Sequence, residues 1–169
     1  WAVADGHLVA EGGKPGWLVT TTEFADFSLR FDYRLAASAA SRVAFRRGPV
    51  GEGPTLAFGH DAPKLSPKQE PFAPGRWQSV TLVAQGDLLV GTLDGAKWFD
   101  STDAKFPEPI RRFRRGTIAF AADPSPAARV ELRRIALKPL GLQPLFNGKD
   151  LAGWKPFPGK PSVFSVTPA

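Results

Sequence analysis

Apolar and polar residues alternate along most of the chain, which is the pattern of half-buried β-strands and not of helices. In the segment 27–35, aromatic and aliphatic residues occupy the odd-numbered positions, while Ser28, Arg30, Asp32 and Arg34 occupy the even-numbered ones. A helix would scatter these residues around its axis. The segment is therefore predicted to be a strand with one apolar and one polar face.

Shorter alternating segments separated by turn-forming residues predict about ten further strands. Asp5-Gly6 and Asp94-Gly95 favour two-residue hairpin turns, because both central residues of a type I′ turn need positive φ. One extra residue near Arg133-Arg134 puts the two halves of the last strand out of phase, which predicts a β-bulge. The expected strands are 1–4, 7–10, 17–20, 27–35, 42–46, 54–60, 76–84, 88–93, 96–99, 116–121 and 129–137.

No apolar stripe of helical spacing runs longer than about two turns. Gly and Pro are abundant, at 17 residues each, and long helices tolerate neither. The apolar share of 43% is enough to build a core in a chain of 169 residues. These features predict an all-β protein in which two antiparallel sheets stack as a sandwich.

Composition excludes several kinds of site. The chain has no cysteine, so disulfides, zinc–thiolate sites, iron–sulfur clusters and a cysteine nucleophile are ruled out. Only two histidines are present, and no Asp-x-Asp-x-Asp cluster occurs, so we expect no cofactor, with Ca²⁺ as a weak alternative. No apolar run approaches the ~18 residues of a membrane span.

The net charge of +6 allows attraction to polyanions, although a solvated arginine-rich surface accounts for it equally well. The densest basic run is Arg111-Arg112-Phe113-Arg114-Arg115, whose central aromatic ring could clamp single-stranded nucleic acid. No recognised nucleic-acid fold accompanies it, so we expect no nucleic-acid partner. A solvated loop or a loop that docks onto a neighbouring domain is the preferred interpretation.

Arginine and aspartate on the polar strand faces could bind saccharide hydroxyls or an anionic sugar through charge-assisted hydrogen bonds. A solvent-facing sheet with cross-strand ion pairs is the competing interpretation. The side chains expected to meet on such a face are Arg30, Asp32, Arg34, Arg42, Arg46 and His60. Trp17, Trp77 and Trp98 could stack on sugar rings, but we expect all three to pack in the core.

The chain carries a set of short motifs at Trp1–Leu8, Phe24–Leu29, Pro74–Gln78, Leu93–Gly95, Val130–Ile135 and Leu145–Trp154. Together they resemble the 3-keto-disaccharide hydrolase domain family, except that the counterpart of Leu145–Trp154 opens the family's domains, whereas here it follows the other motifs. The resemblance covers nearly the whole chain and implies a concanavalin-like jelly roll, the fold of lectins and glucanases. It also implies that a saccharide lies across a concave sheet, and that such domains are exported from bacterial cells, to the periplasm or the exterior.

The chain departs from this family where the family carries its polar groups. The segment 40–46 lacks the family's Asn and Gly but keeps Arg46, and Leu56 stands where the family has Glu. Hydrolysis of a glycosidic bond normally needs two carboxyl groups, one protonated and one ionised. Asp32 and Asp61 are the weak catalytic candidates that remain, so hydrolase activity of this domain is in doubt.

The tail differs in character from the rest, and we place the sandwich domain at 1–140 and a linker at the start of 141–169. The segment Leu145–Trp154 resembles the family's opening segment, and Phe164-Ser165-Val166 resembles Trp1-Ala2-Val3. Either a second similar domain begins in the tail, or the tail supplies a permuted strand that completes the first domain.

Three functions follow from these observations. The preferred one is a non-catalytic carbohydrate-binding or accessory module. The alternatives are an active glycoside-type hydrolase acting on keto-disaccharides or glucans, and a structural module in a larger assembly. The expected partners are a saccharide and a tandem copy or neighbouring domain.

Overall fold

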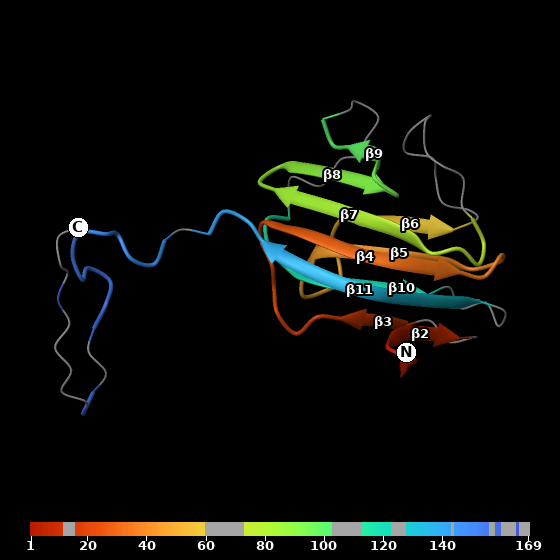
Figure 1. Ribbon diagram of the computed structural model, residues 1–169, viewed down its shortest axis with the longest axis horizontal. Helices are drawn as coiled ribbons and strands as arrows, with labels where there is room; N and C mark the ends of the chain where they lie inside the picture. Colours follow the sequence, from red (N-terminus) through yellow and green to blue (C-terminus); the bar gives the residue numbers. More distant parts are fainter. Residues whose placement is uncertain are drawn as a thin grey trace.

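The chain folds as two antiparallel sheets stacked face to face, seen in the computed structural model (Figure 1). The structure describes residues 1–11, 16–59, 73–102, 113–122, 128–142, 144–155, 158–159 and 165. Its strands are β1 (Ala2–Ala4), β2 (His7–Glu11), β3 (Gly16–Val19), β4 (Phe27–Leu35), β5 (Ala40–Arg47), β6 (Thr55–Gly59), β7 (Gln78–Gln85), β8 (Leu88–Leu93), β9 (Ala96–Asp100), β10 (Thr117–Ala122) and β11 (Arg129–Pro139).

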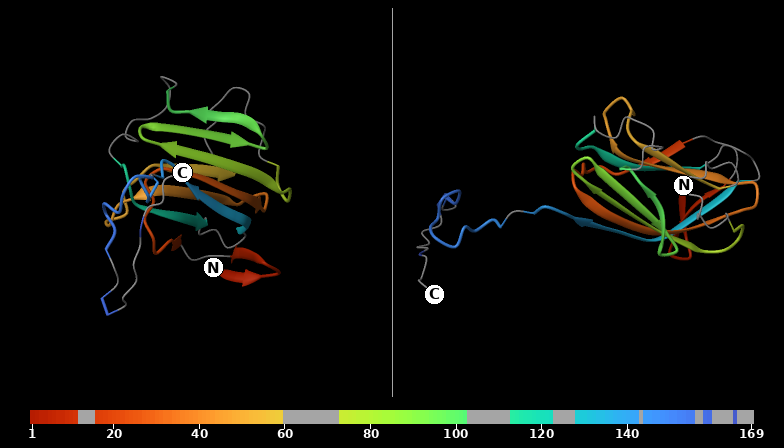
Figure 2. Two further views of the ribbon diagram at one scale, coloured as in Figure 1. Left: turned by 60° about the vertical axis from the view of Figure 1, so that its left-hand side comes forward. Right: turned by 90° about the horizontal axis from the view of Figure 1, so that it is seen from above.

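One sheet has seven strands in the order β1-β2-β11-β4-β7-β8-β9, and the other has four in the order β3-β10-β5-β6. Every paired strand is antiparallel. Seen from above, the two sheets form separate layers (Figure 2). No helix occurs in the described part of the chain, so none there crosses a membrane. The predicted all-β antiparallel jelly-roll sandwich is confirmed.

Local turn chemistry places the hairpins where the sequence predicts them. Asp5 and Gly6 have φ values of 51° and 74°, and Asp94 and Gly95 have 49° and 81°, as a type I′ turn requires. The predicted bulge is also present, because the register of β11 against β4 shifts between Arg133 and Ala136.

Aromatic side chains from both sheets meet in the interior. The ring of Phe31 on β4 lies 5.8 Å from that of Phe58 on β6 and 5.1 Å from that of Phe120 on β10. Trp98 on β9 packs 5.1 Å from Phe58 and is 2% exposed, so its predicted place in the core is confirmed. Because the two sheets bury their inner faces against each other, the other face of each strand is left to interact with solvent or ligand.

The tail leaves the end of β11 and extends away from the sandwich (Figure 1). Its described part folds on itself: the side-chain oxygen of Asn147 accepts backbone hydrogen bonds from Lys149 and Asp150, at 2.9 and 3.0 Å. The indole N–H of Trp154 donates to the carbonyl of Leu145 at 3.2 Å. Residues 145–154 therefore form a locally hydrogen-bonded turn that projects beyond the last strand.

Candidate functional site

The structure divides the predicted polar cluster among three places. Arg30, Asp32 and Arg34 lie together on the outer face of the seven-stranded sheet, whereas Arg42 lies on the outer face of the four-stranded sheet. Arg46 is buried, with 1% of its surface exposed. His60 and Asp61 lie outside the described residues. The single face expected from the sequence is therefore corrected to two faces on opposite sides of the sandwich, plus one internal arginine.

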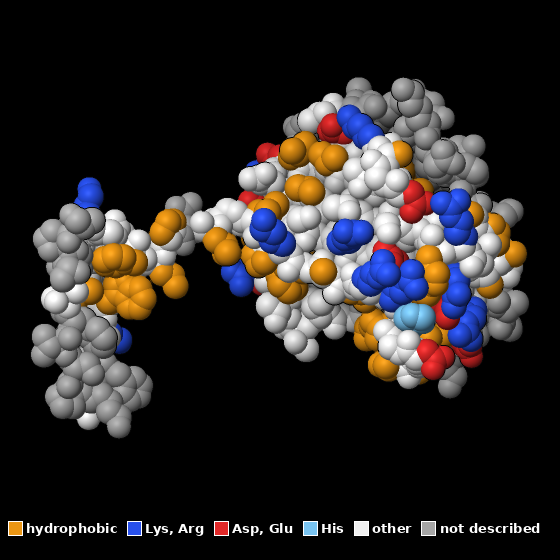
Figure 3. All heavy atoms as spheres, in the orientation of Figure 1, with side chains coloured by type: hydrophobic (Ala, Val, Ile, Leu, Met, Phe, Trp, Pro, Cys, Tyr) orange, Lys and Arg blue, Asp and Glu red, His pale blue; other side chains and the backbone are white. Residues whose placement is uncertain are grey.

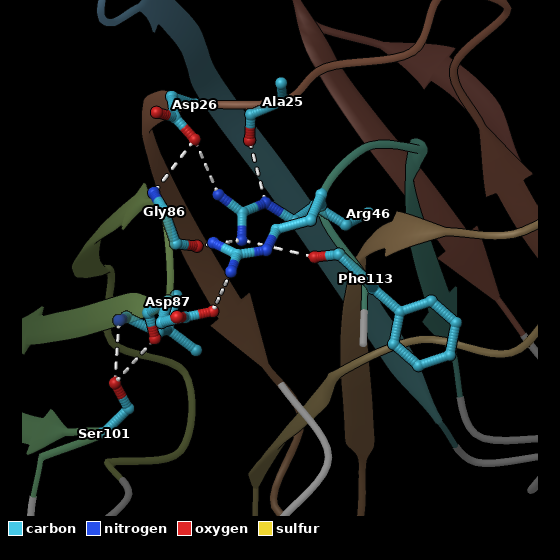
Figure 4. Close-up of polar contacts among 9 residues, drawn as sticks. Ala25, Asp26, Arg46, Gly86, Asp87, Ser101 and Phe113 are labelled. Atoms are coloured by element: carbon cyan, nitrogen blue, oxygen red, sulfur yellow. Dashed lines mark hydrogen bonds and ion pairs between the residues drawn. The ribbon is translucent and has the colours of Figure 1, made fainter. Parts of the chain in front are cut away.

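Arg46 connects segments that are far apart in the sequence (Figure 4). Its Nε donates to the carbonyl of Ala25 at 2.8 Å, and its Nη1 donates to the carbonyls of Gly86 and Phe113 at 2.7 and 3.3 Å. Its Nη2 lies 2.9 Å from Asp26 Oδ1 in an ion pair. All four contacts are to the protein itself, so Arg46 is a structural residue and not one available to a ligand.

The backbone around Arg46 is built for this contact. Arg46 has a φ of 48°, in the left-handed region that non-glycine residues rarely adopt. Gly116 sits against it so closely that a Cβ at this position would lie 2.4 Å from the Arg46 carbonyl carbon. The register of β5 against β10 shifts between Ala44 and Arg47, which marks a β-bulge at Arg46. This bulge turns the guanidinium toward the loop before β4 and the β7–β8 turn, and thereby ties the four-stranded sheet to the seven-stranded one.

The outer face of the seven-stranded sheet carries a cross-strand network. Arg34 on β4 forms two hydrogen bonds with Glu131 on β11, at 2.5 and 2.9 Å. Asp32 accepts hydrogen bonds from Ser79 Oγ at 2.6 Å and from Arg133 Nε at 3.2 Å. Both carboxylates are buried within the network, Asp32 at 2% and Glu131 at 5% exposure. We call the outer surface of the seven-stranded sheet around Asp32, Arg34, Trp77, Glu131 and Arg133 the Trp77 face.

Trp77 lies in the middle of this network and not in the core, so its predicted core position is wrong. The guanidinium carbons of Arg133 and Arg34 lie 3.9 and 4.7 Å from the centre of its ring. The ring of His7 meets it edge-on at 5.0 Å. Within 78–85, Val80, Leu82 and Ala84 face inward, and continuing that alternation back to position 77 points its side chain outward. The outward position of Trp77 could therefore have been predicted from the alternation in the sequence.

The two buried carboxylates on the Trp77 face favour their ionised forms. Hydrogen bonds from Arg34 lower the pKa of Glu131 to about 2, against an opposing effect of burial. Burial alone would raise the pKa of Asp32, but hydrogen bonds from Ser79 and Arg133, with the charge of Arg134, outweigh it and lower the pKa. A general acid in glycoside hydrolysis needs a raised pKa. Neither group has the electrostatics of a proton donor at neutral pH.

The outer face of the four-stranded sheet has a different character. Strand pairing aligns Trp17 on β3, Ala121 on β10, Arg42 on β5 and Ala57 on β6 in one row across the sheet. Since neighbouring strands lie ~4.8 Å apart, the backbones of Trp17 and Arg42 are about 10 Å apart, with only a methyl group between them. We call this surface the Trp17 face.

The two large side chains of the Trp17 face are accessible. Trp17 is 38% exposed, which corrects its predicted core position, and the guanidinium carbon of Arg47 lies 5.3 Å from its ring centre. Arg42 is exposed, and among the described residues the structure gives it no hydrogen bond or ion pair. The next row holds Val19, Ala119, Ala44 and Thr55. Ala119 and Ala44 are 0% and 2% exposed and Ala121 is 7% exposed, so these alanines are covered. The accessible part of the Trp17 face is therefore formed mainly by the Trp17 ring and by the Arg42 side chain, which has no partner among the described residues.

The structure also corrects the comparison made at Leu56. Leu56 and Phe58 point into the core, where they are 5% and 4% exposed. A core-facing position cannot present a carboxylate to a substrate, so Leu56 does not mark a lost catalytic acid. The positions of β6 on the outer face are Thr55 and Ala57, and neither side chain can act as an acid or a base near neutral pH. In the described part of the Trp17 face, no carboxylate is available for acid–base chemistry.

Metal ligands do not converge anywhere in the described residues: no group of three His, Asp or Glu side chains is placed to hold an ion. Of the basic run, Arg111 and Arg112 lie outside the described residues. Arg114 pairs with Asp87 at 2.8 Å, and Arg115 with Glu23 at 3.1 Å. Both described arginines of the run are thus engaged on the protein's own surface.

The architecture is an antiparallel β-sandwich with polar side chains on both outer faces. The model of the 3-keto-α-glucoside-1,2-lyase-like domain matches residues 1–138, and the chain therefore belongs to this family. No protein with curated function matches the chain.

Two solved structures share the fold. A candidate glycosyl hydrolase from Parabacteroides distasonis superimposes with a TM-score of 0.65 at 17% identity, covering 83% of each chain. The carbohydrate-binding module CBM66 from Bacillus subtilis superimposes with a TM-score of 0.58 at 12% identity, covering 77% of this chain and 85% of that one. At these identities the likeness establishes the fold alone.

Replacing Arg46 with leucine is expected to lower the free energy of unfolding by about 3–5 kcal/mol, because it leaves Asp26 and three carbonyl groups without their partner. Denaturant unfolding measures this loss. The matched control is Arg42→Gln, which removes the same charge from an exposed site without a partner and should change stability by less than about 0.5 kcal/mol. Equal effects of the two substitutions would show that Arg46 does not join the sheets.

Stability should also depend on pH through Glu131. Its pKa of about 2 in the folded state is below its ordinary value of 4.5, so ionisation stabilises the fold above pH 4.5. That contribution is lost as pH falls from 4.5 toward 2. The difference in unfolding free energy between the wild type and Glu131→Gln should be largest near neutrality and shrink across this range. A difference that stays constant from pH 7 to pH 2 would contradict the assignment.

Proposed function

We propose that the chain is a non-catalytic carbohydrate-binding module and that it binds a neutral saccharide on the Trp17 face. The observation that carries this proposal is the row in which Ala121 separates the exposed Trp17 from the unpaired Arg42. A sugar ring has C–H groups on its faces and hydroxyls on its rim. It can contact the exposed indole with its apolar side and accept hydrogen bonds from Arg42.

Arg42 suits this role because no carboxylate in the described part of the chain pairs with it. A guanidinium already held in an ion pair must lose that partner before it can bind a ligand, whereas Arg42 keeps its five N–H donors available. The indole and the guanidinium are presented by regular strands, which hold them in place without ordering a loop.

The proposal that the module is non-catalytic rests on the described carboxylates. Those of the Trp77 face are held ionised by arginine, and the described part of the Trp17 face has none. Family membership supports the alternative, glycoside-type hydrolysis, with Asp61 as a candidate group outside the described residues. The two alternatives differ in one observable, because binding without product release supports the module and product release supports the hydrolase.

We also propose that the tail belongs to a neighbouring domain of the same kind and that the protein is exported. The family match covers 1–138, and the described tail projects beyond β11 with Leu145 86% and Trp154 54% exposed. Apolar side chains presented in this way favour contact with another folded unit. Export rests on the family resemblance alone, and detection of the native protein in the periplasmic or extracellular fraction tests it.

Calorimetric titration with neutral glucans and 3-keto-disaccharides tests the saccharide proposal, with product formation followed in the same samples. Trp17→Ala and Arg42→Gln should each weaken binding about tenfold, which corresponds to roughly 1.4 kcal/mol. Arg30→Gln, the same change of charge on the opposite face, should leave the affinity for neutral saccharide within twofold.

The proposal fails if Arg42→Gln binds neutral saccharide as tightly as the wild type while a substitution on the Trp77 face weakens the binding. Because Arg42 is exposed and has no recorded partner, loss of binding in this variant cannot be ascribed to misfolding. Release of product by the wild type would contradict the non-catalytic module and support the hydrolase. Asp61→Asn would then be the variant to examine.

A further inference from the structure

The Trp77 face, on the other side of the sandwich, carries arginine side chains that are not all neutralised by the protein's own carboxylates. On the Trp77 face, Arg34, Arg129, Arg133 and Arg134 pair with carboxylates of the protein, and these carboxylates are Asp32, Glu131 and Glu11. Arg30 has no recorded partner among the described residues. Five arginines thus meet three carboxylates, and the face keeps an excess of positive charge. Figure 3 shows Lys and Arg side chains gathered over β4 and β11.

The bulge in β11 is the second observation. Consecutive strand residues normally point to opposite faces. Arg134 has a φ of 50°, and with this bulge Arg133 and Arg134 both reach Asp32 Oδ2, at 3.2 and 3.6 Å. A left-handed conformation is costly for arginine, and such strain concentrates where function requires it. The effect is to place two neighbouring guanidiniums on the same outer face.

In the described part of the structure, Asp32 accepts a hydrogen bond from only one of these two arginines. Its Oδ1 already accepts from Ser79 at 2.6 Å, and its Oδ2 accepts from Arg133, while Arg134 is left with an ion pair and no recorded hydrogen bond among the described residues. The side chain of Arg134 is 68% exposed. Its N–H donors are therefore available to an external acceptor, as are those of Arg30.

Trp77 fixes the positions of the other cations. Arg133 and Arg34 lie against its ring, and Arg34 is also held by two hydrogen bonds to Glu131. Guanidiniums fixed in this way lose little conformational freedom when a ligand binds. The network around Trp77 thus positions a charged surface in addition to stabilising the sheet.

The arrangement is elongated. Arg30 and Arg34 lie on the same face of β4, four residues and therefore about 13 Å apart along the strand. Arg133 and Arg134 lie beside them on β11, which pairs with β4. A line of cations on a flat sheet fits a linear polymer with repeated acidic groups better than it fits a single small anion.

We propose that the Trp77 face binds an acidic polysaccharide whose carboxylate groups pair with Arg30 and Arg134. Carboxylates are planar acceptors that match the guanidinium fork. The hydroxyls of Thr81 and Thr92 line the same face beside Arg30 and can bind the sugar hydroxyls between the charged groups. This second site is independent of the neutral-saccharide site proposed for the Trp17 face.

The test uses the full chain and polygalacturonate, with a neutral glucan polymer as comparison, titrated at increasing NaCl. The double variant Arg30→Gln/Arg134→Gln should bind polygalacturonate at least tenfold more weakly and with a smaller dependence on salt. Lys149→Gln/Lys155→Gln is the matched control, because it also removes two positive charges, from exposed positions of the tail outside both proposed sites, and it should bind within twofold of the wild type. Thermal unfolding of each variant verifies the fold.

The variant Trp77→Leu tests the positioning of the arginines separately from their charge. It removes no charge, so it should weaken polygalacturonate binding severalfold while leaving the salt dependence unchanged. Equal weakening by the Lys149→Gln/Lys155→Gln control and by Arg30→Gln/Arg134→Gln would show attraction by net charge alone and overturn the site. Single-stranded nucleic acid binding as tightly, with the same sensitivity to the double variant, would overturn the ligand class. Neither result depends on whether Trp17→Ala changes binding of neutral saccharide.

Discussion

Burial of one apolar face by each sheet is the constraint on which the rest of this structure depends. Phe31, Phe58 and Phe120 join the two sheets, and once they are inside, alternation decides which residues each strand presents outward. Trp17 and Trp77 are outward for this reason, although both are large and aromatic. The sandwich thereby acquires two outer surfaces of different chemistry. One presents an exposed tryptophan and an arginine that has no partner in the described part of the chain, and the other presents an arginine network around a tryptophan.

A second constraint closes the end of the sandwich. Arg46 is a buried cation, and a buried cation is tolerated only where its donors are satisfied. Its partners come from three separate segments, at Ala25–Asp26, Gly86 and Phe113, so the same residue that needs them also holds them together. The two functional proposals rest on this frame, because a sheet face can position a ligand only if the strands beneath it are fixed relative to one another.

Local patterns in the sequence predicted the strands well, and β4 and β8 have the predicted bounds. The bulge at Arg134 followed from a break in phase, and the hairpins followed from Asp-Gly pairs. Arg46 could not be assigned in this way, because its partners are distant in sequence and its bulge depends on the close approach of Gly116. The division of Arg30 and Arg42 between opposite faces depends on which sheet each strand joins, and alternation within a strand does not contain that information.

The central claim is that this family member binds saccharide on the face of the four-stranded sheet without hydrolysing it. The most direct measurement is NMR mapping of backbone amides during titration with neutral oligosaccharides, with the sugar signals recorded in the same spectra. The account predicts shifts confined to the rows around Ala121 and Arg42, with the saccharide unchanged. Shifts absent from these rows, or the appearance of cleaved sugar, would contradict it.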